Sequence, residues 1–197
     1  MAHKKSLEAL HKTLQDIRVI TFLDAPGGTG KTFLTNLLLA EVRSKGDLAL
    51  AMASSGIAAT LLHGGRTAHA TLKLPSDIAK QESPVCNISR RSSMAKVLRS
   101  CKLIVWDECT MAHKKSLEAL HKTLQDIGGN RILMGGIILL LCGDFRQTLP
   151  VIPRATPADE VNACLKSSTL WFSVEVVSLK QNMRVSLGKS GYLGFCL

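Results

Sequence analysis

Short continuous runs of apolar residues alternate along this chain with segments whose apolar positions recur every three or four residues. Because strands covered on both faces are apolar throughout, the continuous runs predict a mainly parallel sheet with helices on both faces. The predicted strands are Val19–Asp24, Leu48–Ala53, Leu103–Asp107, Ile137–Cys142 and Val174–Leu179. The predicted helices are Thr32–Arg43, Ile57–Leu62, Met94–Ser100, Met111–Ile127 and Ala158–Lys166. The pattern therefore predicts an α/β fold, with a polar surface loop at Pro75–Asn87.

The segment MAHKKSLEALHKTLQDI occurs twice without a change, at residues 1–17 and 111–127. Structural repeats diverge while keeping their apolar positions, so an identical pair without a third copy indicates a recent duplication or join. The second copy follows the strand KLIVWDE and ends at two glycines, whereas the first meets the strand VITFLD without a turn residue. We expect residues 1–17 to be a duplicated helix outside the inherited domain, residues 18–184 to form that domain, and residues 185–197 to be an irregular tail.

Composition narrows the class of partner. The chain of 197 residues is long enough for one core, and its formal charge of +10 favours a polyanion such as nucleic acid. Only 4% of the residues are aromatic, which argues against a broad base-stacking platform. The six cysteines form no C-x-x-C pair, so we expect no structural metal. Reduced thiols fit a cytosolic or nuclear compartment, and we expect a nuclear location. The longest apolar stretch, Ile132–Cys142, is interrupted by glycines and too short to cross a membrane.

The segment APGGTGKT at residues 25–32 follows the first predicted strand and opens a helix, which is the context of a phosphate-binding loop. Glycines let backbone N–H groups turn toward a phosphate, and the helix N-terminus adds positive charge. Lys31 is expected to reach the β- and γ-phosphates, and the Thr32 hydroxyl to bind Mg²⁺. The strict pattern has glycine where this chain has Ala25. The agreement of strand, loop and helix argues against a chance glycine-rich turn.

Two further strands end in polar residues. Asp107 and Glu108 end LIVWDE, where an aspartate suits Mg²⁺ and a glutamate can activate water as a general base. The alternative is an acid pair at a helix N-terminus with Thr110 as its N-cap. The strand LLLCGDFRQ ends in Asp144, Arg146 and Gln147, and a glutamine there can contact both a γ-phosphate and the attacking water. The alternative for this segment is an ordinary exit from a strand.

With ASSGIAATLLHGGRTAHATLKLP and LKQNMR, these segments closely resemble the petite-integration-frequency (PIF) helicases of superfamily one, especially those of Helitron transposable elements. The resemblance runs from about Val19 to Val185. It implies a RecA-like P-loop NTPase domain with ATP and Mg²⁺ as cofactors and single-stranded DNA as partner. The implied activity is that of an ATP-dependent 5′-to-3′ DNA helicase, with roles in recombination, repair and telomere maintenance.

The resemblance also implies roles for individual residues. The nucleotide-binding residues are Gly27, Gly28, Thr29, Gly30, Lys31 and Thr32, and the Mg²⁺ ligands are Thr32 and Asp107. The catalytic residues are Glu108 as general base, Gln147 as γ-phosphate sensor and Arg184 as the arginine that supplies charge to the transferring phosphate. The residues that grip the backbone of a single strand are Ser54, Ser55, Gly56, Gly65, Thr67 and His69.

Several alternatives stay open. His69 also fits a hydrogen-bonded loop histidine, and Arg184 also fits a solvated surface arginine. The pair Arg90–Arg91, with Lys96 and Arg99 nearby, favours a solvated face over a DNA site.

Family members have two RecA-like domains with ATP between them, and this chain resembles the first alone. We therefore expect the second motor domain to be missing and unwinding to be absent. The adenine-reading glutamine segment that precedes the phosphate loop in the family is replaced here by the first copy of the repeat, so Gln15 receives no role. Two hypotheses remain: an ATP-hydrolysing helicase domain, and a non-catalytic nucleotide- or single-strand-binding fragment of a mobile-element helicase.

Overall fold

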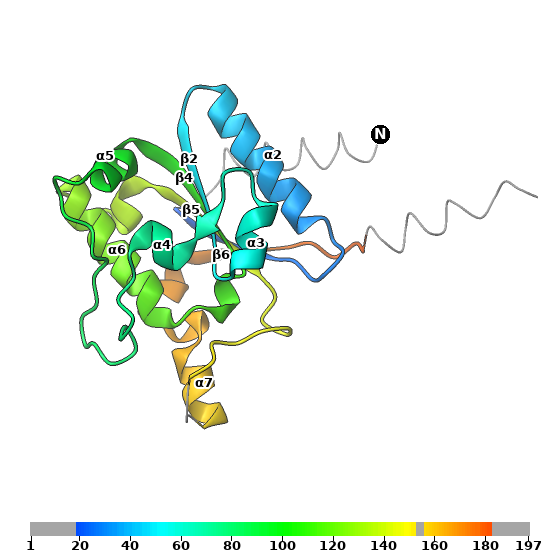
Figure 1. The fold of residues 1–197 in the computed structure, drawn as a ribbon. Helices are drawn as coiled ribbons and strands as arrows, with labels where there is room; N and C mark the ends of the chain where they lie inside the picture. Colours follow the sequence, from blue (N-terminus) through cyan, green and yellow to red (C-terminus); the bar gives the residue numbers. More distant parts are fainter. Residues whose placement is uncertain (1–18, 153–155, 183–197) are drawn as a thin grey trace, which may run out of the picture.

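The computed structural model describes residues 19–152 and 156–182, and Figure 1 shows a central sheet with helices on either side. All strand pairs are parallel, and the six strands follow the order β3-β2-β4-β5-β1-β6. The strands are β1 (Ile20–Asp24), β2 (Leu48–Ala53), β3 (Arg66–Thr67), β4 (Cys101–Asp107), β5 (Ile138–Gly143) and β6 (Val174–Ser178). The predicted parallel α/β sheet is confirmed.

Helices cover both faces of this sheet. They are α2 (Lys31–Ser44), α3 (Gly56–Leu61), α4 (Ala68–Leu72), α5 (Ser93–Ser100), α6 (Lys114–Gly128) and α7 (Pro157–Ala163). Alternate residues of β4 enter two separate cores: Ile104 and Trp106 pack with α4, α5 and α6, whereas Leu103 and Val105 pack with α2 and α3. Strands buried on both faces explain why the sequence shows continuous apolar runs.

The carboxyl ends of the central strands lie at one edge of the sheet. Asp24 at the end of β1 pairs in register with Gly143 of β5 and Ser178 of β6, and Ala53 of β2 pairs with Asp107 of β4. Ligands of open parallel sheets bind at this edge, outside the carboxyl ends of the strands. The topology therefore brings together the three polar strand ends that are separate in the sequence.

Helix α6 holds most of the second copy of the repeated segment, and its polar side chains are bonded to neighbouring segments. Lys115 Nζ donates to the carbonyl of Ala79 at 2.9 Å, and Thr123 Oγ1 accepts from the N–H of Cys86 at 2.9 Å. These bonds hold the Pro75–Asn87 loop against α6; this segment has no helix or strand, yet Cys86 is buried. The first copy lies outside the described residues, so its separation from the domain stays a prediction.

The helix predicted from Met111 begins at Lys114. A 3-10 turn occupies Cys109–Met111, and the N-cap is His113, whose Nδ1 accepts from the N–H of Lys115 at 3.1 Å. Burial and the positive charges of Lys115 and Lys114 lower the pKa of His113, which keeps this nitrogen available as an acceptor. The alternative of Thr110 as N-cap is wrong.

Three further departures from the sequence pattern are local. Strand β3 and helix α4 were not predicted, because each is too short to show a period; Thr67 Oγ1 caps α4 by accepting from the N–H of Ala70 at 3.3 Å. The helix predicted over Ala158–Lys166 is divided into α7 and a 3-10 turn at Leu165–Ser167. Cys164 separates the two pieces with an extended ψ of 149°.

Gly65, in the segment predicted to bind single-stranded DNA, has no room for a larger side chain. A Cβ added to Gly65 would lie 2.3 Å from the carbonyl oxygen of Ala59 in α3, whereas one added to Gly56 meets nothing within 4 Å. We expect Gly65→Ala to lower the free energy of unfolding by about 1–3 kcal/mol. The melting temperature should fall by about 2–4 °C for each kcal/mol.

Thermal unfolding followed by circular dichroism measures this effect, and Gly56→Ala is the matched control, with a melting temperature at or slightly above that of the parent. Equal melting temperatures for the two variants would contradict the packing argument.

Candidate nucleotide site and the adjoining surface

The segment between β1 and α2 forms a tight loop at the carboxyl edge of the sheet. Gly28 and Gly30 have φ values of +84° and +85°, in the left-handed region that favours glycine. Thr29 closes the turn, because its N–H and its Oγ1 donate to the carbonyl of Pro26 at 3.3 and 2.8 Å. Helix α2 begins directly afterwards at Lys31, so its free N–H groups lie beside the loop. This is the geometry of a phosphate-binding loop.

Ala25 does not disturb this loop. Its φ is not positive, so it tolerates a Cβ, and its side chain is buried in the core under α2. Its N–H donates to the carbonyl of Gly143 at 3.1 Å, which joins the loop to β5. The departure from the strict sequence pattern has no structural cost.

A pocket of about 400 Å³ opens between this loop and the ends of β4 and β5. The predicted nucleotide and catalytic residues that line it are Gly27, Gly28, Gly30, Lys31, Thr32, Glu108 and Gln147. Thr29 is the exception, because its hydroxyl is bonded within the loop and its side chain is buried; the structure gives it a supporting position. Chain segments more than a hundred residues apart thus line one pocket.

Lys31, which lines this pocket, forms an ion pair with Asp107 at the end of β4. Asp107 is 2% exposed, and the same carboxylate oxygen accepts the N–H of Glu108 at 2.8 Å. A carboxylate this deeply buried needs a cation, and the hard oxygens of Asp107 and of the neighbouring Thr32 hydroxyl suit Mg²⁺. The residues present therefore fit the metal that a bound nucleotide would bring.

Glu108 is one of three described non-glycine residues with a positive φ, at +49°. This conformation is strained for a residue with a Cβ, and such strain is found preferentially at functional sites. The side chain does not extend freely, because its Oε2 accepts a hydrogen bond of 2.6 Å from Ser55 Oγ.

Gln147 is positioned by Asp144, a residue for which the sequence predicted no role. Gln147 Nε2 donates to Asp144 Oδ2 at 3.0 Å, and Asp144 Oδ1 accepts from the N–H and Nε of Arg146, both at 3.0 Å. Burial opposes the charged form of Asp144, but these bonds outweigh it and hold its pKa below the ordinary value. Asp144 is therefore an anion at neutral pH that fixes the Gln147 amide at the pocket rim.

The segment that leads to Arg184 passes over the phosphate loop. Asn182 Nδ2 donates to the carbonyl of Gly27 at 3.5 Å, and a Cβ added to Gly28 would lie 2.8 Å from Asn182 Oδ1. The backbone also follows β1, since the N–H of Leu179 donates to the carbonyl of Asp24 at 2.9 Å. Arg184 itself lies outside the described residues, and its role stays a prediction.

The residues predicted to grip single-stranded DNA lie directly after β2 and in and around β3. Ser54 and the exposed His69 line a second pocket of about 310 Å³, together with buried Trp106. Gly65 and Thr67 have structural positions already, in packing against α3 and in capping α4. The second pocket adjoins the first at the end of β4, because Trp106 in this strand lines the second pocket and Glu108, directly after the strand, lines the first.

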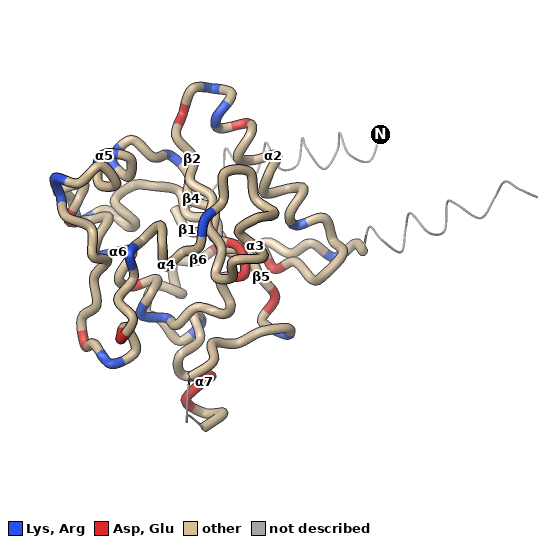
Figure 2. The backbone as a smooth tube through the Cα atoms, viewed as in Figure 1, with Lys and Arg blue, Asp and Glu red and all other residues tan. Residues whose placement is uncertain are grey.

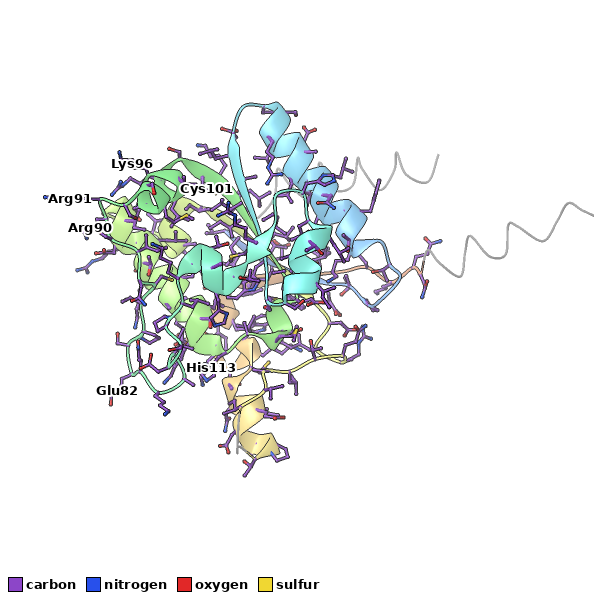
Figure 3. All side chains as sticks on the ribbon, in the orientation of Figure 1. Glu82, Arg90, Arg91, Lys96, Cys101 and His113 are labelled. Atoms are coloured by element: carbon purple, nitrogen blue, oxygen red, sulfur yellow. The ribbon has the colours of Figure 1, made fainter. Side chains whose placement is uncertain are left out.

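Basic residues are spread along many elements in Figure 2, without one continuous stripe. Arg90, Arg91 and Lys96 project outward at the edge beside α5, away from α2 and α3 (Figure 3). Arg90 Nε donates to Asp126 at 2.9 Å, and Arg99 Nε donates to the carbonyl of Ile127 at 3.1 Å. This cluster pairs with α6, as a solvated face does.

Within residues 19–152 and 156–182, no helix is long and apolar enough to cross a membrane. The same ranges contain no group of three or more His, Cys, Asp or Glu side chains able to hold a metal ion. The five cysteines in them are buried and free of disulfides, and burial raises the pKa of the Cys86 thiol to about 11. The Cys86 thiol is therefore protonated at neutral pH.

A parallel sheet with a phosphate loop after β1 and an acid pair at the end of β4 defines a RecA-like P-loop NTPase domain. The family model described as PIF1-like helicase matches residues 8–191. The chain belongs to the PIF1-like helicase family.

Curated relatives match most of this chain with a small part of their own. The ATP-dependent DNA helicase Pif1 of Psychrobacter sp. (strain PRwf-1) is 27% identical over 168 residues, which are 85% of this chain and 25% of the relative. The human ATP-dependent DNA helicase PIF1 is 30% identical over 136 residues, 69% of this chain and 21% of the relative. The chain therefore spans about a quarter or less of the length of these relatives.

Solved structures agree with the fold. The crystal structure of Pif1 helicase from Candida albicans matches with a TM-score of 0.72 and 25% identity, covering 90% of this chain and 39% of that one. The Bacteroides Pif1 helicase in complex with ADP-AlF3 and single-stranded DNA matches with a TM-score of 0.70. The match covers 91% of this chain and 42% of the Bacteroides chain. Because the sequence identity with the Bacteroides protein is 19%, this match supports the fold alone.

Proposed function

We propose that this chain is the ATP-binding and ATP-hydrolysing domain of a DNA helicase that moves 5′ to 3′ on single strands. The observation that carries the proposal is the convergence of the phosphate loop, the Lys31–Asp107 pair, Glu108 and Gln147 on one pocket. The relatives named as ATP-dependent DNA helicases support it, as does a related Pif1 structure that contains ADP-AlF3 and single-stranded DNA.

Each residue has a specific part in this proposal. The loop N–H groups bind the phosphates, and Lys31 exchanges its contact with Asp107 for the β- and γ-phosphates. Asp107 and Thr32 would hold Mg²⁺, which supplies charge neutralisation at the phosphates. Glu108 accepts the proton of the attacking water, and Gln147 orients that water while held by Asp144.

We propose that single-stranded DNA lies along the Ser54–Gly56 turn and the second pocket, with His69 as a contact. Phosphate contacts make such binding weaker in salt, with a slope of about −0.7 per neutralised phosphate. A single sheet edge offers few contacts, so we expect a shallow slope for the parent chain. His69→Ala should weaken binding of an oligothymidylate by about 1 kcal/mol.

Fluorescence anisotropy over a salt series measures both quantities. His63→Ala is the matched control, because His63 is exposed on the same segment but does not line the second pocket. Equal affinities for the two variants would remove His69 from the surface proposed for DNA.

The roles in recombination, repair and telomere maintenance, the nuclear location and the Helitron origin are part of the same proposal. They rest on the resemblance, and buried reduced cysteines fit the nuclear location. The competing function is non-catalytic binding of nucleotide or single strands, and it differs in one respect: the pocket would bind ATP without hydrolysing it.

A further inference from the structure

Glu108, the general base of the proposed function, is tied to a residue of the proposed DNA surface. Ser55 Oγ donates to Glu108 Oε2 at 2.6 Å, although the two residues lie 53 positions apart. Ser55 Oγ also accepts a hydrogen bond of 3.2 Å from the N–H of Ala58 and thereby caps α3. The single hydroxyl proton of Ser55 is thus committed to Glu108, and its acceptor capacity to the helix.

The turn that carries Ser55 is fastened to β4 at two further points. The N–H of Ser54 donates to the carbonyl of Asp107 at 3.0 Å, and Trp106 Nε1 donates to Ser54 Oγ at 3.0 Å. Ser54 lines the second pocket and Glu108 lines the nucleotide pocket. The Ser54–Ser55 turn therefore connects a residue of the second pocket to one of the nucleotide pocket, and the Ser55–Glu108 bond is the link that ends on the proposed general base.

Glu108 and a bound DNA phosphate would compete for the hydrogen bond that the Ser55 hydroxyl donates. A serine hydroxyl has one donor, so it can serve Glu108 or a phosphate oxygen at the turn, but not both. A DNA phosphate at this turn would accept the hydrogen bond in place of Glu108. Its negative charge would also repel the Glu108 carboxylate toward the nucleotide pocket.

We propose that Ser55 is a positioning residue that restrains Glu108, and that single-stranded DNA releases this restraint when a phosphate oxygen accepts the Ser55 hydrogen bond in place of Glu108. The inference rests on the proposed function and adds the link between its two sites. Through this link, strand binding raises the rate of ATP hydrolysis without a new contact to the nucleotide.

The hydrolysis test compares four variants with and without oligothymidylate. Ser55→Ala and Ser55→Asp both remove the donor, and Ser55→Asp keeps an N-cap acceptor for α3, so a folded variant is retained. Both should raise the DNA-independent kcat by about tenfold, the effect of one charge-assisted hydrogen bond, with KM for ATP unchanged. Ser55→Thr, which keeps the hydroxyl, should restore the low rate. Thr60→Ala, which removes another hydroxyl of α3 that is bonded to the carbonyl of Ile57 at 2.7 Å, should behave as the parent.

Equilibrium binding of DNA tests the same link without ATP hydrolysis, because the coupling free energy between two binding sites is reciprocal. Glu108→Gln should raise affinity for oligothymidylate more in the parent than in the Ser55→Ala background. Loss of the charge alone would raise affinity equally in both backgrounds, which would overturn the proposal.

The proposal is also overturned by an unchanged or lower DNA-independent rate in Ser55→Ala and Ser55→Asp while DNA still stimulates the parent. That result leaves the proposed function intact and gives Ser55 only the role of a helix cap. A parent chain that binds but never hydrolyses ATP overturns both.

Discussion

Replacing Glu108 with glutamine is expected to lower the rate constant of ATP hydrolysis by about 10²–10⁴, the contribution of a positioned general base. ATP affinity should stay within about twofold, because the phosphate loop, Lys31 and Asp107 are unchanged. The amide oxygen can still accept a hydrogen bond from Ser55, a weaker one because the amide is uncharged, so the fold should be retained. Single-turnover hydrolysis and calorimetric ATP binding, measured on the same preparation, separate the two effects.

The matched control for this variant is Glu118→Gln. Glu118 lies on α6, and its Oε1 accepts from Ser168 Oγ at 2.8 Å, away from the residues that line the nucleotide pocket. It should hydrolyse ATP as the parent does. Equal rates for Glu108→Gln and Glu118→Gln would mean that another group activates the water.

Replacing Lys31 with alanine is expected to weaken Mg²⁺-dependent ATP binding by about 1.5–3 kcal/mol, or roughly 10–150-fold. The change removes a charge-assisted bond to the phosphates, and it also takes from the buried Asp107 the cation that pairs with it, leaving the hydrogen bond from the N–H of Glu108. Stability should therefore also fall, which thermal unfolding reports separately from binding by calorimetry.

Lys45→Ala controls for loss of a positive charge, because Lys45 ends α2 in an exposed pair with Glu41 at 2.9 Å. Its ATP affinity should match that of the parent, since such surface pairs contribute little. A Lys31→Ala chain with the parent's ATP affinity would remove the phosphate loop from the account.

The features of the fold and site that could be predicted from the sequence are those that depend on a local pattern of residues. Continuous apolar runs located five of the six strands, because a parallel sheet buries both faces of its strands. The glycines of the phosphate loop were found for a similar reason: the positive φ at Gly28 and Gly30 favours one residue type. Ala25 looked like a defect only because the sequence does not show backbone angles.

What the sequence did not predict depends on contacts between distant segments. Strand β3 is two residues long and has no detectable period. The Asp144–Gln147 bond follows from a turn, and the Ser55–Glu108 bond joins the ends of neighbouring strands. Their residue types are common in loops, so only the topology that places the ends of β2 and β4 side by side indicates the contacts.

Single-turnover hydrolysis of ATP by the parent chain, with and without an oligothymidylate, tests the central claim most directly. The chain is held in excess over ATP, so slow chemistry is measured apart from product release. The account predicts Mg²⁺-dependent hydrolysis that is faster with DNA and is lost in Glu108→Gln. Bound ATP that stays intact under both conditions, or hydrolysis that persists unchanged in Glu108→Gln, would contradict it.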